Sequence, residues 1–255
     1  MDTTIGTISV VIPAYNCVAS IGAAIDSVLV QTLLPMEIVI VDDCSTDKTT
    51  DFLQSLSEKY PQIRLLRNDR NCGVALSRNR GVQEAKGDWI AFLDSDDQWT
   101  ADKLEKQAKM LAETGGSFGF TGSAFIDETG RLMPGILEVP EAVGRQALLR
   151  QNVISCSSVM IRRDVMLRYP MIPGSIHEDF HAWLRILEEL PAANGLNEPL
   201  LIYRLSAESR SGNKVRSFRM NYRTYRAVGL SPLQSCGKMY WYTINGLRKY
   251  HKINK

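Results

Sequence analysis

The sequence predicts an α/β protein with a doubly wound, mostly parallel sheet. Short β-branched or apolar runs alternate with segments of helical periodicity through the first hundred residues, and the connections between them are short. This alternation is typical of repeated strand–helix–strand units, whose crossovers are right-handed. Acidic residues directly follow two of the runs, and open sheets of this class bind ligands beyond the carboxyl ends of their strands.

The first half of the chain is expected to hold four strands and three intervening helices. The predicted strands are residues 8–12, 36–41, 63–66 and 89–93, of which the first should stop at Pro13. The predicted helices are residues 18–30, a segment capped by Asp47, and residues 75–86. The run 89–93 is apolar throughout, which indicates the buried central strand.

The second half has weaker patterns. A further helix should start near Thr100, followed by one or two strands over residues 115–126 and another strand over residues 152–161. Residues 127–140 carry no clear signal. Apolar residues at helical spacing follow His177-Glu178-Asp179 and predict a buried helix there.

Composition indicates a globular protein of the reducing cytosol. The chain has 255 residues, 44% hydrophobic and 23% charged, enough to bury the core of one large domain with an appendage. No run of 18 apolar residues occurs, so no membrane-spanning helix is expected, and the N-terminus lacks the features of a signal peptide. The five cysteines are dispersed, with no CxxC pair, which indicates free thiols.

The charge is distributed unevenly. Residues 210–255 contain eleven Lys or Arg and no Asp or Glu, which leaves 19 basic and 28 acidic residues in the first 209. A basic tail on an acidic body indicates an anionic partner, such as a membrane surface, a phosphorylated lipid or a nucleic acid.

The acidic strand ends are the strongest chemical signal. Asp94, Asp96 and Asp97 follow the central strand; they would repel one another unless a divalent cation were bound. The alternative is a solvated acidic loop. Asp42-Asp43 follows the second strand, and Tyr15 after the first offers a ring on which a base could stack. Neither a GxGxxG turn nor a P-loop sequence is present.

Four segments together resemble glycosyltransferase family two. They are VVIPAYN, EIVIVDDCSTDKT, RNDRNCGVALSRNRGVQEAKGDWIAFLDSDD and the later HED, and they span about residues 8–185 in the family's order. The resemblance implies a GT-A fold and an inverting enzyme that uses a nucleotide-sugar donor, most commonly a UDP-sugar, with Mn²⁺ or Mg²⁺ as cofactor.

The resemblance also implies roles for individual residues. The nucleoside would be held by Pro13, Tyr15 and Asp43, with Asp42 beside it. Asp94, Ser95 and Asp96 match the DxD element, which touches ribose and the metal, the metal ligands being Asp94 and Asp96. Arg78 would lie near the pyrophosphate. Asp179 matches the catalytic base, and Glu178 is its companion.

Each of these residues also has a structural interpretation. Asp42 and Asp43 could form a turn and helix cap, Tyr15 could be a packing residue, and Glu178 and Asp179 could be ordinary acids of a helix N-terminus. Arg78 and Arg80 lie on one short predicted helix and cannot both point inward.

The tail contains a predicted interfacial helix. Phe218, Tyr222 and Tyr225 fall within about 80° at 100° per residue, and Arg216, Arg219, Arg223 and Arg226 lie beside them. This pattern is typical of a helix lying on an anionic bilayer, with Arg219, Arg223 and Arg226 contacting the membrane and the acceptor. The alternative is a helix packed against the body with a solvated basic face. Nucleic acid is not expected as a partner, because an acid-lined crevice would repel it.

The expected organisation is a GT-A domain over residues 1–205 and a helical tail over 206–255. The domain would divide into a nucleotide-sugar half, about 1–115, and an acceptor half, about 116–205. The expected reaction moves a hexose or N-acetylhexosamine from a UDP-sugar to a polyprenyl diphosphate-linked sugar, at the inner face of the plasma membrane, in bacterial surface polysaccharide (O-antigen) assembly. The alternatives are a nucleotidyltransferase of sugar phosphates and a catalytically silent binding module.

Overall fold

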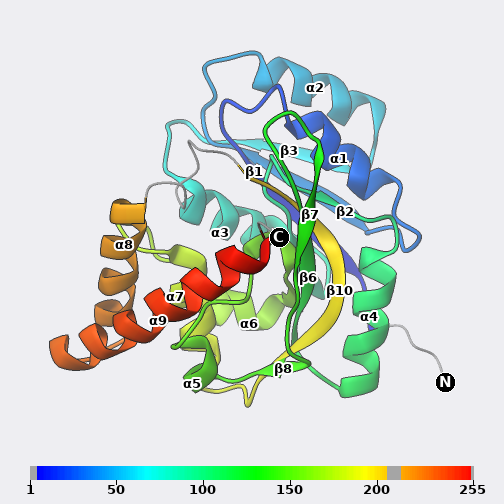
Figure 1. The fold of residues 1–255 in the computed structure, drawn as a ribbon. Helices are drawn as coiled ribbons and strands as arrows, with labels where there is room; N and C mark the ends of the chain where they lie inside the picture. Colours follow the sequence, from blue (N-terminus) through cyan, green and yellow to red (C-terminus); the bar gives the residue numbers. More distant parts are fainter. Residues whose placement is uncertain (1–4, 206–213, 254–255) are drawn as a thin grey trace.

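A central sheet flanked by helices on both faces forms the body of the protein (Figure 1). The computed structural model describes residues 5–205 and 214–253. The predicted α/β class is confirmed. Among the described residues, no helix combines the length and the apolar character that crossing a membrane requires.

The first half follows the predicted alternation closely. Its elements in chain order are β1 (Ile8–Ala14), α1 (Ile21–Leu29), β2 (Glu37–Asp42), α2 (Thr49–Lys59), β3 (Ile63–Arg67), α3 (Val74–Glu84), β4 (Trp89–Phe92), β5 (Gln98–Trp99) and α4 (Lys103–Thr114). The Asp47 side chain accepts a hydrogen bond from the Thr49 N–H at 2.9 Å, and so caps the start of α2 as expected.

Strand β1 continues through Pro13 instead of stopping before it. The Val11 carbonyl accepts the Leu93 N–H at 3.1 Å, so the backbone groups of Val11 point toward β4. Pro13, two residues later, faces the same side. Pairing with β4 has already ended there, at Val11–Phe92, so the missing N–H of Pro13 costs no hydrogen bond of the sheet.

The second half is more irregular than the sequence suggests. Its elements are β6 (Phe118–Ile126), β7 (Leu132–Leu137), β8 (Ala142–Val143), α5 (Arg145–Leu148), the 3₁₀ turn η1 (Cys156–Ser158), β9 (Met160–Arg162), α6 (Arg163–Arg168), α7 (Glu178–Ile186), β10 (Ala193–Arg204), α8 (Lys214–Ala227) and α9 (Pro232–Ile253). The single strand predicted over residues 152–161 is wrong, because η1 interrupts it and only β9 remains. Residues 127–140, which carry no sequence signal, contain β7.

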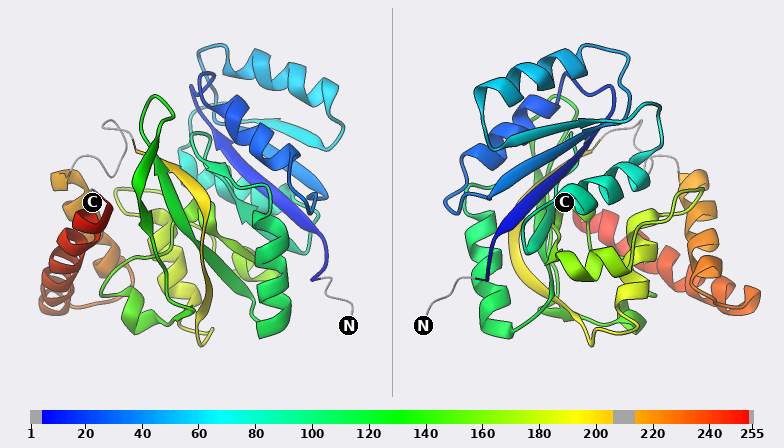
Figure 2. Two further views of the ribbon diagram at one scale, coloured as in Figure 1. Left: turned by 45° about the vertical axis from the view of Figure 1, so that its right-hand side comes forward. Right: turned by 180° about the vertical axis from the view of Figure 1, so that it is seen from behind.

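The strand order is β3-β2-β1-β4-β9-β6-β10-β5, with β7 paired to β6 and β8 to β10. Pairing is parallel from β3 to β4, as predicted. Beyond β4 the sheet is mixed, because β9 runs antiparallel to both β4 and β6 while β10 runs parallel to β6. The predicted nucleotide-sugar and acceptor halves therefore share one continuous sheet (Figure 2).

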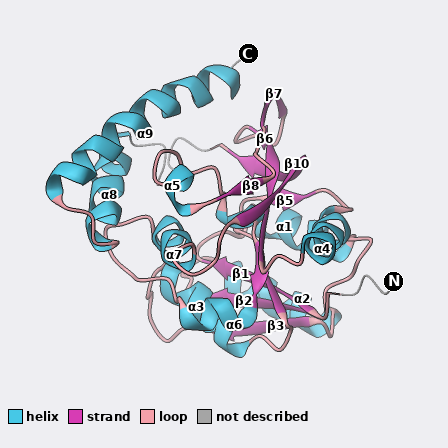
Figure 3. Cartoon of the chain, turned by 90° about the horizontal axis from the view of Figure 1, so that it is seen from below, coloured by secondary structure: helices cyan, strands magenta, loops and turns pink. Residues whose placement is uncertain are grey.

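The two faces of the sheet bury separate cores. One core joins β1, β2 and β4 to α1, α2 and α4. The other joins the opposite face to α3, α6 and α7, with Tyr225 of α8 added at its margin. Seen from below, α8 lies beside α7, and α9 runs from the end of α8 back toward β7 (Figure 3).

Helix α8 packs against the body, and this corrects the aromatic stripe predicted for the tail. Tyr225 is fully buried, contacts the Phe180 ring at a centroid distance of 5.8 Å, and donates its hydroxyl to the Leu149 carbonyl at 3.0 Å. Phe218 stays 51% exposed. The three aromatics share an arc that lies at the edge of the buried face, so the most inward of them, Tyr225, joins the core.

Replacing Tyr225 with alanine is expected to lower the free energy of unfolding by about 3–5 kcal/mol, because it leaves a cavity between α8 and α7. Tyr225→Phe, which removes only the hydroxyl, should cost about 1 kcal/mol. Denaturant unfolding followed by circular dichroism measures both. The control Phe218→Ala should change stability by less than about 0.5 kcal/mol; a Tyr225→Ala protein as stable as this control would contradict the packing of α8.

Candidate active site

The loops after β1 and β2 are hydrogen-bonded to each other at the carboxyl ends of these strands. The Asn16 Oδ1 accepts the Thr46 N–H at 2.8 Å, and the Asn16 N–H donates to the Ser45 Oγ at 3.0 Å. Asn16 adopts a φ of 47°, a left-handed conformation that asparagine tolerates. Pro13 is buried in β1, whereas Tyr15 is 47% exposed, so its ring is available for stacking as the sequence suggested.

Asp42 is held inside the turn after β2, and its predicted contact with the nucleoside stays a prediction. Its side chain has no exposed surface. One carboxylate oxygen accepts the N–H and the Oγ–H of Ser45, at 3.0 and 2.5 Å, and the other accepts the Thr50 hydroxyl at 2.6 Å. Asp42 therefore shapes the turn that leads into α2.

Asp43 holds the loop that precedes α3. Its carboxylate accepts hydrogen bonds from the Asn68 side chain at 2.6 Å and from the backbone N–H groups of Cys72 and Gly73 at 2.9 and 2.7 Å. Only 3% of the residue is exposed. A direct contact between Asp43 and a nucleoside stays a prediction. The structure shows that the Asp43 carboxylate fixes the backbone of Cys72 and Gly73 before α3.

The acid triplet after β4 divides into two parts. Asp94, Ser95 and Asp96 are partly exposed. Asp97 is buried and accepts the Ser157 hydroxyl at 2.6 Å and the Arg204 N–H at 3.0 Å. Burial, followed by the charges of the two neighbouring aspartates, raises the pKa of Asp97 well above its usual range. Asp97 therefore links the loop to Ser157 and Arg204 inside the protein, and the two accessible carboxylates are Asp94 and Asp96.

Arg78 connects this acid pair to the start of α7. Its side chain is 5% exposed, and its guanidinium donates to Asp94 Oδ1 at 2.5 Å and to Glu178 Oε1 at 3.1 Å. Burial by itself would lower the pKa of Arg78, but the carboxylates around it raise that pKa above its ordinary value. Arg78 therefore bridges two carboxylates of the protein, and its predicted position near the pyrophosphate stays a prediction.

The sequence argument that only one of Arg78 and Arg80 can point inward is confirmed. The Arg80 guanidinium lies on the other side of α3, where it donates to the Arg67 carbonyl at 2.7 Å and to Asn68 Oδ1 at 2.6 Å.

Asp179 lies in the first turn of α7, next to Glu178. Its Oδ1 accepts the Phe180 N–H at 2.7 Å. Burial, and then the charge of Glu178, raise the pKa of Asp179 above its usual range. A carboxylate with a raised pKa is a stronger base, so the position suits proton abstraction from a hydroxyl.

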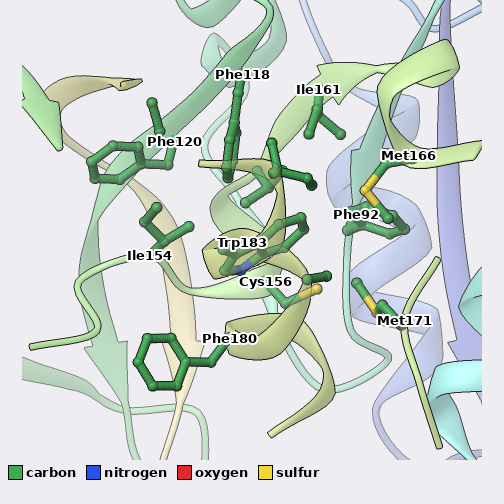
Figure 4. Close-up of a cluster of buried hydrophobic side chains, with 14 of the residues drawn as sticks. Phe92, Phe118, Phe120, Ile154, Cys156, Ile161, Met166, Met171, Phe180 and Trp183 are labelled. Atoms are coloured by element: carbon green, nitrogen blue, oxygen red, sulfur yellow. The ribbon is translucent and has the colours of Figure 1, made fainter. Parts of the chain in front are cut away.

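The core beneath α7 fixes Asp179 relative to the acid pair. Trp183 is fully buried, with its ring centroid 5.0 Å from that of Phe118 on β6 and 6.3 Å from that of Phe92 on β4 (Figure 4). Phe92 lies two residues before Asp94. Asp179 and Asp94 are therefore carried by elements that pack against the same rings.

The pair Asp94 and Asp96 fits a divalent cation. Burial, and then the charge of Asp94, raise the pKa of Asp96 to about 6, and among the described residues Asp96 forms no ion pair. The nearby charges of Arg204 and Arg78 offset this rise only in part, and carboxylate oxygens are the ligands that Mg²⁺ and Mn²⁺ prefer. Within the described part of the chain, no group of three or more His, Cys, Asp or Glu could hold a metal, so the substrate diphosphate and water would supply the remaining ligands.

Sequence reasoning missed two residues that organise the acid loop. Ser157 accepts the Asp94 N–H at 3.0 Å while its own hydroxyl bonds Asp97. The Arg204 guanidinium donates to the carbonyls of Asp96, Asp127 and Glu128. Both come from distant strands or turns, and no local pattern marks them.

The tail arginines separate into two groups. Arg219 and Arg223 line a cavity of about 360 Å³ together with Arg216. Arg226 does not line it, and its guanidinium donates to the Leu230 carbonyl just beyond the helix.

Solved structures share this fold. Staphylococcus aureus TarS (residues 1–349) in complex with UDP-GlcNAc aligns with a TM-score of 0.71 at 18% identity, covering 91% of this chain and 70% of that chain. The mannosyltransferase PcManGT from Pyrobaculum calidifontis, in complex with GDP-Man and Mn²⁺, aligns with a TM-score of 0.65 at 17% identity, covering 92% and 68%. The architecture is the GT-A fold.

Two sequence relatives are named as glycosyltransferases. The Bacillus subtilis protein TuaG, whose name places it among the glycosyltransferases of teichuronic acid biosynthesis, is 36% identical over 87% of this chain and 88% of its own. The Escherichia coli protein WfaP, named as a UDP-Glc:alpha-D-GlcNAc-diphosphoundecaprenol beta-1,3-glucosyltransferase, is 33% identical over 95% of both chains. Residues 9–168 match the family described as Glycosyl transferase family 2. The chain belongs to this family, and the predicted resemblance is confirmed.

Proposed function

We propose that this glycosyltransferase moves a hexose or N-acetylhexosamine from a UDP-sugar to a hydroxyl of a polyprenyl diphosphate-linked sugar, with inversion of the anomeric centre. The proposal rests on the two ion pairs of Arg78. One holds Asp94 at the proposed donor end, and the other holds Glu178, the neighbour of Asp179, at the proposed acceptor end. A base and a diphosphate site held at a fixed distance are what a single displacement requires.

The donor assignment is supported on two sides. Tyr15 is exposed beside the carboxyl ends of β1 and β2, where open sheets bind nucleotides. The relative WfaP is named for UDP-Glc, and TarS binds UDP-GlcNAc. PcManGT, which binds GDP-Man, shows that the fold also accepts another base, so UDP specificity is part of the proposal.

Asp179 acts as the base in the proposed reaction. It takes the proton of the acceptor hydroxyl while that oxygen attacks the anomeric carbon from the face opposite the departing diphosphate. The Phe180 N–H holds one carboxylate oxygen, which leaves the other free to face the hydroxyl. One displacement of this kind converts an α-linked donor into a β-linked product.

A divalent cation held by Asp94 and Asp96 would neutralise charge on the departing diphosphate. Replacing Asp96 with asparagine is therefore expected to weaken Mn²⁺ or Mg²⁺ activation by at least about 10- to 100-fold, the loss usual when a hydrogen-bonding partner of a metal ligand is removed, without unfolding the protein. A metal titration of the initial rate measures this shift. Asp97→Asn serves as the contrasting variant, since Asp97 is buried and should affect stability more than metal dependence. A wild-type enzyme fully active in EDTA would refute the metal assignment.

The acceptor and the membrane location rest on the relatives and the tail. The name of WfaP specifies a diphosphoundecaprenol-linked sugar, an acceptor that lies at a membrane surface. On α9, Leu233, Tyr240 and Trp241 are largely exposed, and α8 exposes four arginines. Such a surface favours peripheral binding to the inner face of a plasma membrane.

The direct test is transfer by the purified protein. A panel of UDP- and GDP-sugars is incubated with N-acetylglucosamine linked through diphosphate to a short alkyl chain, and nucleotide release and product mass are recorded. Transfer from one UDP-sugar, giving a β-linked product, is the expected result. Nucleotidyl transfer to a sugar phosphate would favour the nucleotidyltransferase alternative, and donor binding without turnover would favour a silent binding module.

A further inference from the structure

A basic cavity lies between α8 and the segment that leads into α7. It has a volume of about 360 Å³, and the residues that line it are Gly174, Ser175, Val215, Arg216, Arg219, Met220 and Arg223. The lining of the cavity contains three guanidinium groups and no carboxylate. The cavity is separate from the acid pair at the end of β4.

The charge of the cavity follows from the geometry of α8. At about 100° per residue, Arg216, Arg219 and Arg223 fall within roughly 60° of one another, beside the buried Met220. Among the described residues, neither Arg219 nor Arg223 pairs with a carboxylate. Guanidinium groups match phosphate oxygens bidentately, so the cavity suits a phosphorylated anion.

The cavity adjoins the segment that carries the catalytic base. Gly174 and Ser175 precede Asp179 by four to five residues. The N–H of His177 donates to the Thr224 hydroxyl at 3.0 Å, and the Ser217 Oγ lies 3.4 Å from the His177 ring Nε2. Helix α8 is therefore bonded directly to the start of α7, which holds the cavity at a fixed position relative to Asp179.

Two exposed apolar side chains of α8 lie at or near the cavity. Val215 lines it and is 65% exposed, and Phe218, one turn later on α8, is 51% exposed. An anion site beside exposed apolar side chains suits a ligand that carries both a phosphate group and a hydrocarbon chain.

We propose that this cavity binds the diphosphate of the lipid-linked acceptor, with Arg219 and Arg223 as its principal ligands and the lipid chain passing over Val215 and Phe218. This inference rests on the proposed function and assigns its acceptor site. It transfers the role expected for Arg226 to Arg216, which lines the cavity where Arg226 does not.

The test compares the double variant Arg219→Gln/Arg223→Gln with Arg226→Gln, a control on the same helix. The KM is measured for N-acetylglucosamine diphosphate on a short, water-soluble alkyl chain, and for the same alkyl glycoside without the diphosphate. The double variant should raise the KM for the diphosphate acceptor about 10- to 100-fold. The KM for the diphosphate-free acceptor and for the donor should not change. Arg226→Gln should leave the KM for these water-soluble acceptors unchanged, since Arg226 does not line the cavity.

Binding of the soluble diphosphate glycolipid, measured by calorimetry without donor, separates this proposal from the proposed function. If the wild type transfers to no diphosphate acceptor yet binds this compound, and the double variant does not, the proposed function fails and the cavity assignment stands. An unchanged KM and unchanged binding in the double variant overturn the assignment. Loss only of binding to phosphatidylglycerol vesicles also overturns it, since the cavity would then hold a lipid headgroup.

Discussion

Replacing Asp179 with asparagine is expected to lower kcat by about 10²- to 10⁴-fold, the usual contribution of a general base. The substitution keeps the shape of the side chain and its acceptance of the Phe180 N–H, but the amide cannot take a proton. The KM for the donor should stay close to that of the wild type, because the proposed donor site lies at the carboxyl ends of β1, β2 and β4. Steady-state rates of UDP release at saturating acceptor measure the effect.

The pH dependence of the reaction provides the control. Glu178 contributes to the raised pKa of Asp179, so Glu178→Gln should lower that pKa and move the acid limb of kcat/KM to lower pH. Activity is lost as the pH falls through the pKa of the base, and a lower pKa therefore preserves activity further into acid. A collapse of donor affinity in Asp179→Asn, with kcat retained, would make Asp179 a binding residue instead.

Replacing Arg78 with methionine is expected to lower the free energy of unfolding by about 3–5 kcal/mol, the cost of breaking a buried ion pair by removing one partner. Methionine fills much of the same volume, so the loss reports mainly the two carboxylates left without their cation. The Glu178 side chain is 9% exposed and that of Asp94 29% exposed, which places the larger part of the penalty on Glu178.

Urea unfolding followed by fluorescence checks this stability prediction. The matched control is Arg80→Met on the same helix, which should cost less than about 1.5 kcal/mol, because it removes hydrogen bonds to an amide and a carbonyl but leaves no charge unpaired. Equal losses in the two variants would mean that the bridge between Asp94 and Glu178 does not contribute to stability. The kcat of Arg78→Met should also fall, since Asp179 would lose its fixed neighbour.

The first half of the chain was predictable because its signals are local. Each predicted strand and helix there has its own periodicity. The errors are ends such as Pro13, where the geometry of pairing decides, and the two-residue strand β5, which no local pattern predicts. The second half depends on pairing between distant segments. Three residues of β9 fill the gap between β4 and β6, and no window of the sequence distinguishes so short a strand from a loop.

The site shows the same division. The acid pair and Asp179 could be selected as candidates because they lie in short motifs. The roles of Arg78 and Asp42 could not, because they depend on neighbours. Arg78 meets Glu178, a hundred positions later, and Asp42 turns back onto Ser45 and Thr50. A motif identifies the residue type that a fold requires but does not specify which atoms the carboxylate or guanidinium meets.

The position of β5 limits how enzymes of this fold can be recombined. Gln98 and Trp99 belong by sequence to the first half, yet they pair with β10 at the far edge of the sheet, and the Trp99 ring N–H donates to the Ser157 carbonyl at 2.7 Å. In a chimaera that took residues 1–115 from a homologue, the homologue's β5 would have to pair with β10 of this protein. A mismatch in this pairing would disturb Ser157, whose hydroxyl holds the Asp94 N–H. Donor preference should therefore be exchanged through the loop tips after β1 and β2, with the sheet inherited whole.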